Sequence, residues 1–189
     1  MKKLNEKKDL ELLTQLLEMI KDPANHLESI HSDLESVGVK YAFIGGLALR
    51  PHSYSRMTTD IDILISKNTV EKLKELLGQG YTLRPGASKN MYLHVANSRI
   101  FVDILVEDQK ENGVLLPDPT QIRQKINGVW YASLPALINL KLQAGRPQDV
   151  VDVLKLIEAN ELHQTYINNL SPNVHKKFLN LFINHGETK

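Results

Sequence analysis

The stretch YAFIGGLALRPHSYSRMTTDIDILI, residues 41–65, decides the fold of this 189-residue chain. It opens with an apolar run that ends at Gly45-Gly46 and closes with DIDILI, in which isoleucines alternate with aspartates. Side chains two apart in a strand share a face, so Asp60 and Asp62 are expected to project together while the isoleucines are buried on the opposite face. The stretch therefore predicts two strands joined by a glycine turn, a short helix and a polar loop.

Adjacent carboxylates suggest a cation site. Two such charges repel, and a cation between them relieves the repulsion; oxygen ligands suit Mg²⁺ or Mn²⁺. A third carboxylate, Asp103, interrupts the apolar run RIFVDILV, residues 99–106, where an unpaired buried charge is costly. If this strand lies beside the DID strand, three carboxylates form one cluster that can hold divalent ions for phosphoryl chemistry. Taken singly, each aspartate could instead cap a turn, lie in solvent or pair with a nearby cation.

The remaining periodicities predict an α+β protein with its strands grouped in the middle. Helices are expected over 9–20, 23–37, 68–77, 134–144 and 147–159, with a looser pair from 162 onward; strands are expected over 39–44, 60–66, 81–83, 91–96, 99–106 and 129–132. A tight turn is expected at Asn97-Ser98, and the polar segment 107–120 is expected to be a linker or long loop. We expect N-terminal helices (1–37), a catalytic core (38–110) and a mostly helical C-terminal region (111–189).

Composition excludes several classes of protein. The chain is 42% hydrophobic and 24% charged, with a net charge of +1, so neither a disordered chain nor a strongly basic nucleic-acid binder is indicated. It has no cysteine, which excludes disulfides and thiolate catalysis and favours a cytoplasmic location. No apolar run reaches the roughly 20 residues of a membrane helix, and no signal peptide is evident.

Taken together, the apolar strand, Gly45-Gly46, thirteen further residues, DID and a later isolated aspartate resemble the DNA polymerase β-like nucleotidyltransferase superfamily. The resemblance implies a nucleotidyltransferase fold: a small mixed β-sheet flanked by helices, with an N-terminal helical arm and a C-terminal helical tail. Within the superfamily, GGLA with Arg56, Thr59 and DIDILI most resembles the AbiEii-type toxin branch. The tail LPALINLKLQAGRPQDVVDVLKLI, residues 134–157, resembles the helical segment of that branch.

The resemblance also implies roles for individual residues. Asp60 and Asp62 would ligate Mg²⁺ or Mn²⁺, and Asp103, the third carboxylate, would help deprotonate the acceptor hydroxyl. Gly45 and Gly46 would contact the triphosphate, although a pair of glycines can also simply make a tight turn. Many members of the superfamily carry serine at the second of these positions, whereas Gly46 offers only its backbone.

Three further residues complete the expected nucleotide site. Arg56 is close enough to the DID strand to reach a phosphate with its planar head, and Thr59 belongs to the same motif. Lys141 could hold the triphosphate as a point charge, or could be a solvated lysine on a helix. Asp149 and Asp152, three apart on one helix, could pair with Arg146 or Lys155.

The sequence therefore predicts a metal-dependent nucleotidyltransferase that moves an NMP from an NTP to an acceptor hydroxyl and releases pyrophosphate. The acceptor could be an RNA 3′ end, a protein or a small molecule. The alternative is a catalytically inactive binding or antitoxin-like module of the same fold. A cognate partner protein or a homodimer is compatible with either hypothesis.

Overall fold

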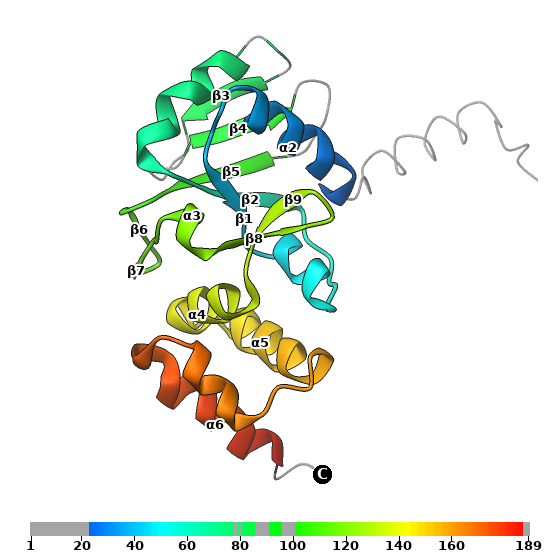
Figure 1. Ribbon diagram of the computed structural model, residues 1–189, viewed down its shortest axis with the longest axis vertical. Coiled ribbons are helices and arrows are strands. Elements are labelled where there is room, and N and C mark those ends of the chain that lie inside the picture. The colour runs from blue at the N-terminus through cyan, green and yellow to red at the C-terminus, as the bar shows by residue number, and fades with distance from the viewer. Residues whose placement is uncertain (1–22, 78, 80, 86–90, 96–100, 187–189) are drawn as a thin grey trace, which may run out of the picture.

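The computed structural model describes residues 23–77, 79, 81–85, 91–95 and 101–186. Its main sheet has seven strands in the order β3-β4-β5-β2-β1-β9-β8 (Figure 1). The strands of this sheet are β1 Tyr41–Phe43, β2 Asp60–Ile65, β3 Tyr81–Pro85, β4 Met91–Val95, β5 Phe101–Val106, β8 Arg123–Ile126 and β9 Val129–Ala132.

The sheet is mixed at its centre. β2 is antiparallel to β1 on one side and parallel to β5 on the other, and β9 runs parallel to β1. Central strands such as β1 and β2 are covered on both faces, which favours their β-branched and aromatic residues. β9 belongs to the segment expected to be mostly helical, yet it joins the same sheet as the residues before 110. The predicted boundaries at 37/38 and 110/111 stay predictions.

One face of the sheet packs against α2 (Leu27–Ser36), which follows the short 3₁₀ helix η1 (Pro23–His26), and against η3 (Lys67–Leu76). Leucines at helical spacing in α2 and the isoleucines of β2 form this first core. The helix expected after β2 is 3₁₀ rather than α. The Thr69 hydroxyl there donates to the Ser66 carbonyl at 2.9 Å and so competes with regular helical bonding.

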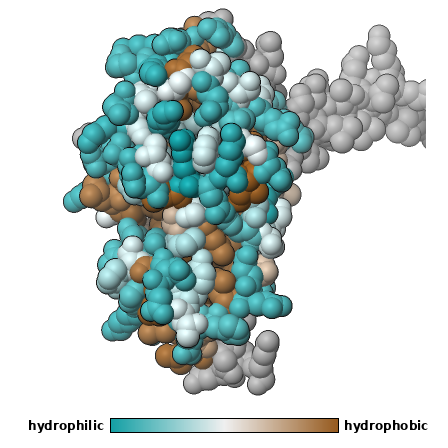
Figure 2. Space-filling view, viewed as in Figure 1, coloured by the Kyte–Doolittle hydropathy of each residue, from teal (hydrophilic) through white to brown (hydrophobic). Residues whose placement is uncertain are grey.

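The other face packs against η2 (Leu47–His52), α4 (Leu134–Ala144) and α5 (Pro147–Ala159). Beyond these helices lie the last helical elements, η4 Gln164–Asn169, η5 Pro172–Val174 and α6 His175–Gly186. The sheet with α2 forms one layer, and α4, α5 and α6 form a second layer below it along the long axis of the molecule (Figure 1). Hydrophobic residues reach the surface along the boundary between these two layers (Figure 2). Leu64 of β2 and Leu137 of α4 belong to this second core, so the same strand serves both faces.

The segment expected to be a loop contains a hairpin, so that expectation was wrong. β6 (Lys110–Glu111) and β7 (Val114–Leu115) pair around Asn112-Gly113, whose φ angles are +49° and +80°. Asn-Gly readily adopts the positive φ angles that a tight hairpin turn requires. The hairpin leads into α3 (Pro119–Ile122), and its Val114 side chain is buried beside α4.

Most expected elements are present, and α4 and α5 have the expected bounds. The expected helix over 9–20 and the Asn97-Ser98 turn lie outside the described residues. None of the described helices is both long enough and apolar enough to cross a membrane.

Candidate active site

Three carboxylates meet on the face of the sheet that carries α4 and α5. β2 and β5 run parallel, and their register sets Asp62 directly beside Asp103. Asp60, two residues along the same strand, lies on the same face as Asp62. One ligand oxygen from each of the three lies within 4.8 Å of the others. The strand adjacency that the sequence hypothesis required for Asp103 is therefore observed.

The cluster is electrostatically costly without a cation. Burial, followed by the charges of Asp60 and Asp103, raises the pKa of the Asp62 carboxyl from 3.8 to about 6. Burial also raises the pKa of Asp103, and the charges of Asp60 and Glu111 act in the same direction. A divalent ion would relieve both effects, because it supplies opposite charge where the carboxylates crowd.

Gly45 lets the chain pass directly against this cluster. Its φ is +66°, and a Cβ at this position would lie 1.8 Å from Oδ2 of Asp62. The turn after β1 therefore needs glycine for two reasons: the left-handed backbone and the absence of a side chain next to a carboxylate.

Replacing Gly45 with alanine should destabilise the protein and displace Asp62. Positive φ alone costs an L-residue about 1–2 kcal/mol, and the overlap with Asp62 should add about 1–3 kcal/mol. Gly113→Ala is the matched control, because Gly113 also has a positive φ (+80°) but no atom within 4 Å of an added Cβ. The measurement is urea unfolding of both variants, and equal losses of unfolding free energy would contradict the overlap.

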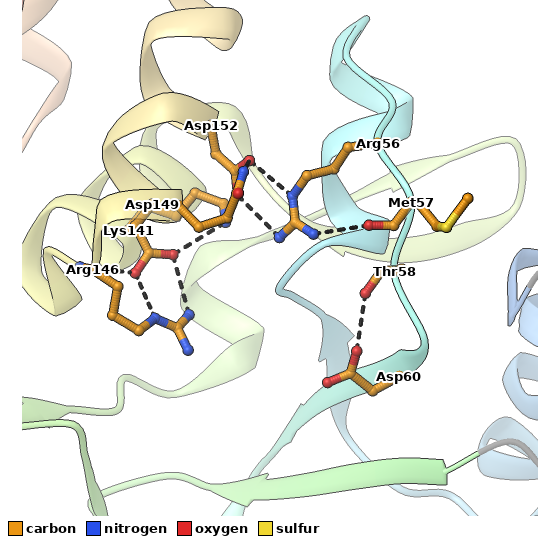
Figure 3. Close-up of polar contacts among 9 residues, drawn as sticks. Arg56, Met57, Thr58, Asp60, Lys141, Arg146, Asp149 and Asp152 are labelled. Atoms are coloured by element: carbon orange, nitrogen blue, oxygen red, sulfur yellow. Dashed lines mark hydrogen bonds and ion pairs between the residues drawn. The ribbon is translucent and has the colours of Figure 1, made fainter.

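A chain of ion pairs joins the loop before β2 to α4 and α5 (Figure 3). Arg56 donates two hydrogen bonds to the Asp152 carboxylate, from Nε to Oδ1 at 2.9 Å and from Nη2 to Oδ2 at 3.2 Å. Lys141 of α4 donates to the same carboxylate at 2.6 Å. Burial alone would raise the pKa of Asp152, but hydrogen bonds from Arg56 and Lys141 outweigh it and lower that pKa.

The chain continues through the second aspartate of α5. Lys141 lies 3.5 Å from Asp149, and Arg146 donates to Asp149 from Nε at 2.7 Å and from Nη2 at 3.1 Å. Lys141 is only 5% exposed, so it is not a solvated helix lysine. Lys155 pairs with Glu158 instead of with either aspartate. The paired aspartates thus hold the cations beside the carboxylate cluster.

The carboxylates, the glycine turn and these cations line one cavity of about 430 Å³. Seven of the eight residues predicted for the site line it: Gly45, Gly46, Arg56, Asp60, Asp62, Asp103 and Lys141. The exception is Thr59, which is exposed and reaches Asp60 Oδ1 with its hydroxyl at 3.4 Å. Its neighbour Thr58 lines the cavity instead, with its hydroxyl 3.0 Å from the same oxygen.

Sequence reasoning missed other lining residues. Arg146 and Gln148, at the start of α5, and Glu111 and Asn112, at the tip of the hairpin, all reach the cavity wall. Arg146 was considered only as a partner for an aspartate, and the hairpin was read as a loop. The Asn112-Gly113 pair was the available signal for that turn.

The donor set fits a hard divalent cation. Three carboxylates with convergent oxygens match the ligands of Mg²⁺ or Mn²⁺, which keep some positions for water or phosphate oxygens. Burial, and after it the charges of Asp60 and Asp103, raise the pKa of Asp62 at the same point, so a cation there would stabilise its charged form. Asp60, Asp62 and Asp103 could therefore hold such an ion, and the cavity beside them could admit a phosphorylated ligand.

Comparison with known proteins identifies the fold. No family model matches the chain, and no curated protein matches its sequence. Its structure is similar to that of an antigenic nucleotidyltransferase-like protein from Paracoccidioides brasiliensis, at TM-score 0.60 and 16% identity over 89% of this chain and 91% of the other.

Two further solved structures are similar as well. ANT(2")-Ia in complex with adenylyl-2"-tobramycin aligns at TM-score 0.56 and 13% identity, over 84% of this chain and 99% of that one. Lincomycin-bound LnuA, a lincosamide antibiotic adenylyltransferase, aligns at 0.51 and 18% identity, over 70% and 94%. The expected α+β nucleotidyltransferase fold, a mixed sheet flanked by helices, is confirmed.

Proposed function

We propose that the chain is a metal-dependent nucleotidyltransferase that moves an NMP from an NTP to an acceptor hydroxyl, with release of pyrophosphate. The observation that carries the proposal is the convergence of Asp60, Asp62 and Asp103 beside the Gly45-Gly46 turn in one cavity. The similarity in fold to nucleotidyltransferases supports it. A module that only binds a partner has no evident use for three crowded carboxylates.

In this proposal each wall of the cavity has a separate task. Asp60 and Asp62 hold the ion with Asp103, and the ion, when bound, neutralises charge on the transferring phosphoryl group. The backbone of Gly45 and Gly46, which lines the cavity, contacts the triphosphate.

Three cationic side chains also line the cavity: Arg56, Lys141 and Arg146. Arg56 keeps N–H groups free of Asp152, and Arg146, whose side chain is 62% exposed, can turn toward a phosphate oxygen. Lys141 contributes its charge while its ammonium remains bound to Asp152.

The transfer step uses Asp103 as the proton acceptor. Asp103 takes the proton of the acceptor hydroxyl as the hydroxyl oxygen forms a bond with the α-phosphorus. The bond from that phosphorus to the bridging oxygen breaks, and pyrophosphate leaves with the electron pair. Asp103 suits this role because it lies on β5, the neighbouring strand, to one side of the Asp60 and Asp62 pair.

Nucleotide binding should depend on the divalent ion. Five carboxylates but only three cationic side chains line the cavity, so a bare triphosphate meets net repulsion. Calorimetry with each NTP should detect binding in Mg²⁺ or Mn²⁺, and removing the metal with a chelator should weaken that binding at least tenfold, or about 1.4 kcal/mol. Asp60→Ala and Asp62→Ala should abolish the metal-dependent part. If no NTP binds in the presence of metal, the enzyme hypothesis fails and the inactive module becomes the better account.

The acceptor is the open part of the proposal. Of the similar structures, one contains adenylyl-2"-tobramycin and another contains lincomycin. Small hydroxylated molecules should therefore be tested alongside RNA 3′ ends and protein hydroxyls. Incubation with labelled NTPs and cell extract, fractionated into small molecules, RNA and protein, would identify the labelled class. Since NTPs are cytoplasmic, we propose a cytoplasmic reaction. An AbiEii-like toxin role with a cognate partner remains a hypothesis, which growth assays on expression would test.

A further inference from the structure

The space beside Gly46 is occupied by the side chain of Thr58. A Cβ on Gly46 would lie 3.0 Å from Thr58 Oγ1 and 3.1 Å from Thr58 Cβ. Arg56 Nη2 borders the same space at 3.3 Å. The Thr58 hydroxyl therefore lies in the space that a side chain at position 46 would need.

The Thr58 hydroxyl is aimed at a proposed metal ligand. It donates to Asp60 Oδ1 at 3.0 Å (Figure 3), and it does so from a residue that lines the cavity. Thr59 reaches the same oxygen only at 3.4 Å and from an exposed position. Both hydroxyls use Oδ1, which leaves Asp60 Oδ2 free of these bonds. A carboxylate with one oxygen tied by a donor presents its other oxygen in a defined direction.

We propose that Thr58 is a positioning residue of the metal site: its hydroxyl, in the space left by Gly46, orients Asp60 for the ion. This inference rests on the proposed function, because it presupposes a divalent cation at the carboxylates. Partners that hold a metal ligand in place are typically worth about 10–100-fold in metal affinity. The absence of a side chain at Gly46 is then part of the site, because a Cβ there would require Thr58 to shift by a few tenths of an ångström, which would disturb its hydrogen bond to Asp60.

The test is Mn²⁺ binding without nucleotide, followed by the electron paramagnetic resonance signal of free Mn²⁺. Thr58→Val keeps the shape but removes the donor, and it should weaken Mn²⁺ binding about 10–100-fold. Thr58→Ser keeps the hydroxyl and should bind within about threefold of the unmodified protein. Thr59→Val is the comparison variant and should weaken Mn²⁺ binding much less, because the Thr59 hydroxyl reaches Asp60 Oδ1 only at 3.4 Å. If Thr58→Val binds as tightly as Thr59→Val, the inference is overturned.

A double-mutant cycle tests the role of Gly46. Gly46→Ala should weaken Mn²⁺ binding in the unmodified protein, because its Cβ displaces the Thr58 hydroxyl. In a Thr58→Gly background, which lacks both the hydroxyl and the Cβ that Gly46 faces, the same change should cost little further Mn²⁺ affinity. Independent, additive losses would contradict the inference, because they would mean that Gly46 and Thr58 act separately.

Two results separate this inference from the proposed function. If the unmodified protein and Asp60→Ala both fail to bind Mn²⁺, the proposed metal site itself is refuted. If the unmodified protein binds Mn²⁺, Asp60→Ala does not and Thr58→Val is normal, the metal site stands and only the role of Thr58 is refuted. Thermal melting of Thr58→Ser and Thr58→Val checks that each variant is folded.

Discussion

Replacing Asp62 with asparagine should reduce nucleotidyl transfer by a factor on the order of 10³ or more, equivalent to several kcal/mol of transition-state stabilisation. Asp62 is two residues from Asp60 on β2 and directly beside Asp103 on β5, so its loss removes one of the three convergent ligands. The amide keeps the size of the side chain but carries no charge for the ion. Single-turnover transfer from labelled NTP, with metal in excess, is the measurement.

The same substitution should make the metal-free protein more stable. Burial and two neighbouring carboxylates disfavour the Asp62 charge, and asparagine removes it. Each kcal/mol gained would raise the melting temperature by about 2–4 °C in a domain of this size. Asp108→Asn is the control, because Asp108 is an exposed surface carboxylate paired with Lys67. An active Asp62→Asn protein, or one that is less stable without metal, would contradict the arrangement described.

The second large effect concerns stability. Asp152→Ala should lower the unfolding free energy by about 3–5 kcal/mol, the range for breaking a buried ion pair from one side. Asp152 is fully buried and holds both Arg56 and Lys141, so its removal leaves two cations without their shared carboxylate. Urea unfolding with a folded-state check by circular dichroism measures the loss.

Glu158→Ala is the control for that effect, because Glu158 lies on the same helix but pairs with Lys155 near the surface. Exposed pairs contribute about 0–1 kcal/mol, so this variant should be almost unchanged. Adding Lys141→Met to Asp152→Ala should recover part of the lost stability, since it removes a buried cation that has lost its nearer carboxylate and keeps only Asp149, at 3.5 Å. A loss below about 1 kcal/mol for Asp152→Ala would mean that solvent reaches the network.

Local patterns in the sequence predicted much of the fold. The alternation in DIDILI is a property of the strand itself, so the common face of Asp60 and Asp62 follows from their spacing. The bounds of α4 and α5 follow from prolines near their first residues and from apolar spacing. The Asn112-Gly113 pair and the apolar residues after it also indicated a hairpin, but the strand before the turn, Lys110–Glu111, is short and polar and so gives no strand pattern.

Contacts between distant parts of the chain were not readable in this way. Arg56 and Asp152 are 96 residues apart, and neither residue type nor spacing indicates that they pair. The sequence is compatible with Lys141 in solvent or in a buried site. The packing of α5 against α4 decides between them, because it brings Asp149 and Asp152 to the Lys141 ammonium. The sequence does not distinguish Thr58 from Thr59 as the residue that contacts Asp60 from within the cavity. The distinction depends on Gly46, which follows β1, whereas both threonines precede β2.

The sequence by itself therefore determined the strand that carries Asp60 and Asp62, because backbone alternation is local. Only the tertiary structure decided that Asp103 lies beside Asp62, that buried aspartates hold the cations, and that Thr58 fills the space at Gly46. Each of these depends on which strands pair and how helices pack on the sheet. Strand pairing and helix packing are determined by the apolar surface that the whole chain buries. A short sequence motif therefore cannot predict them.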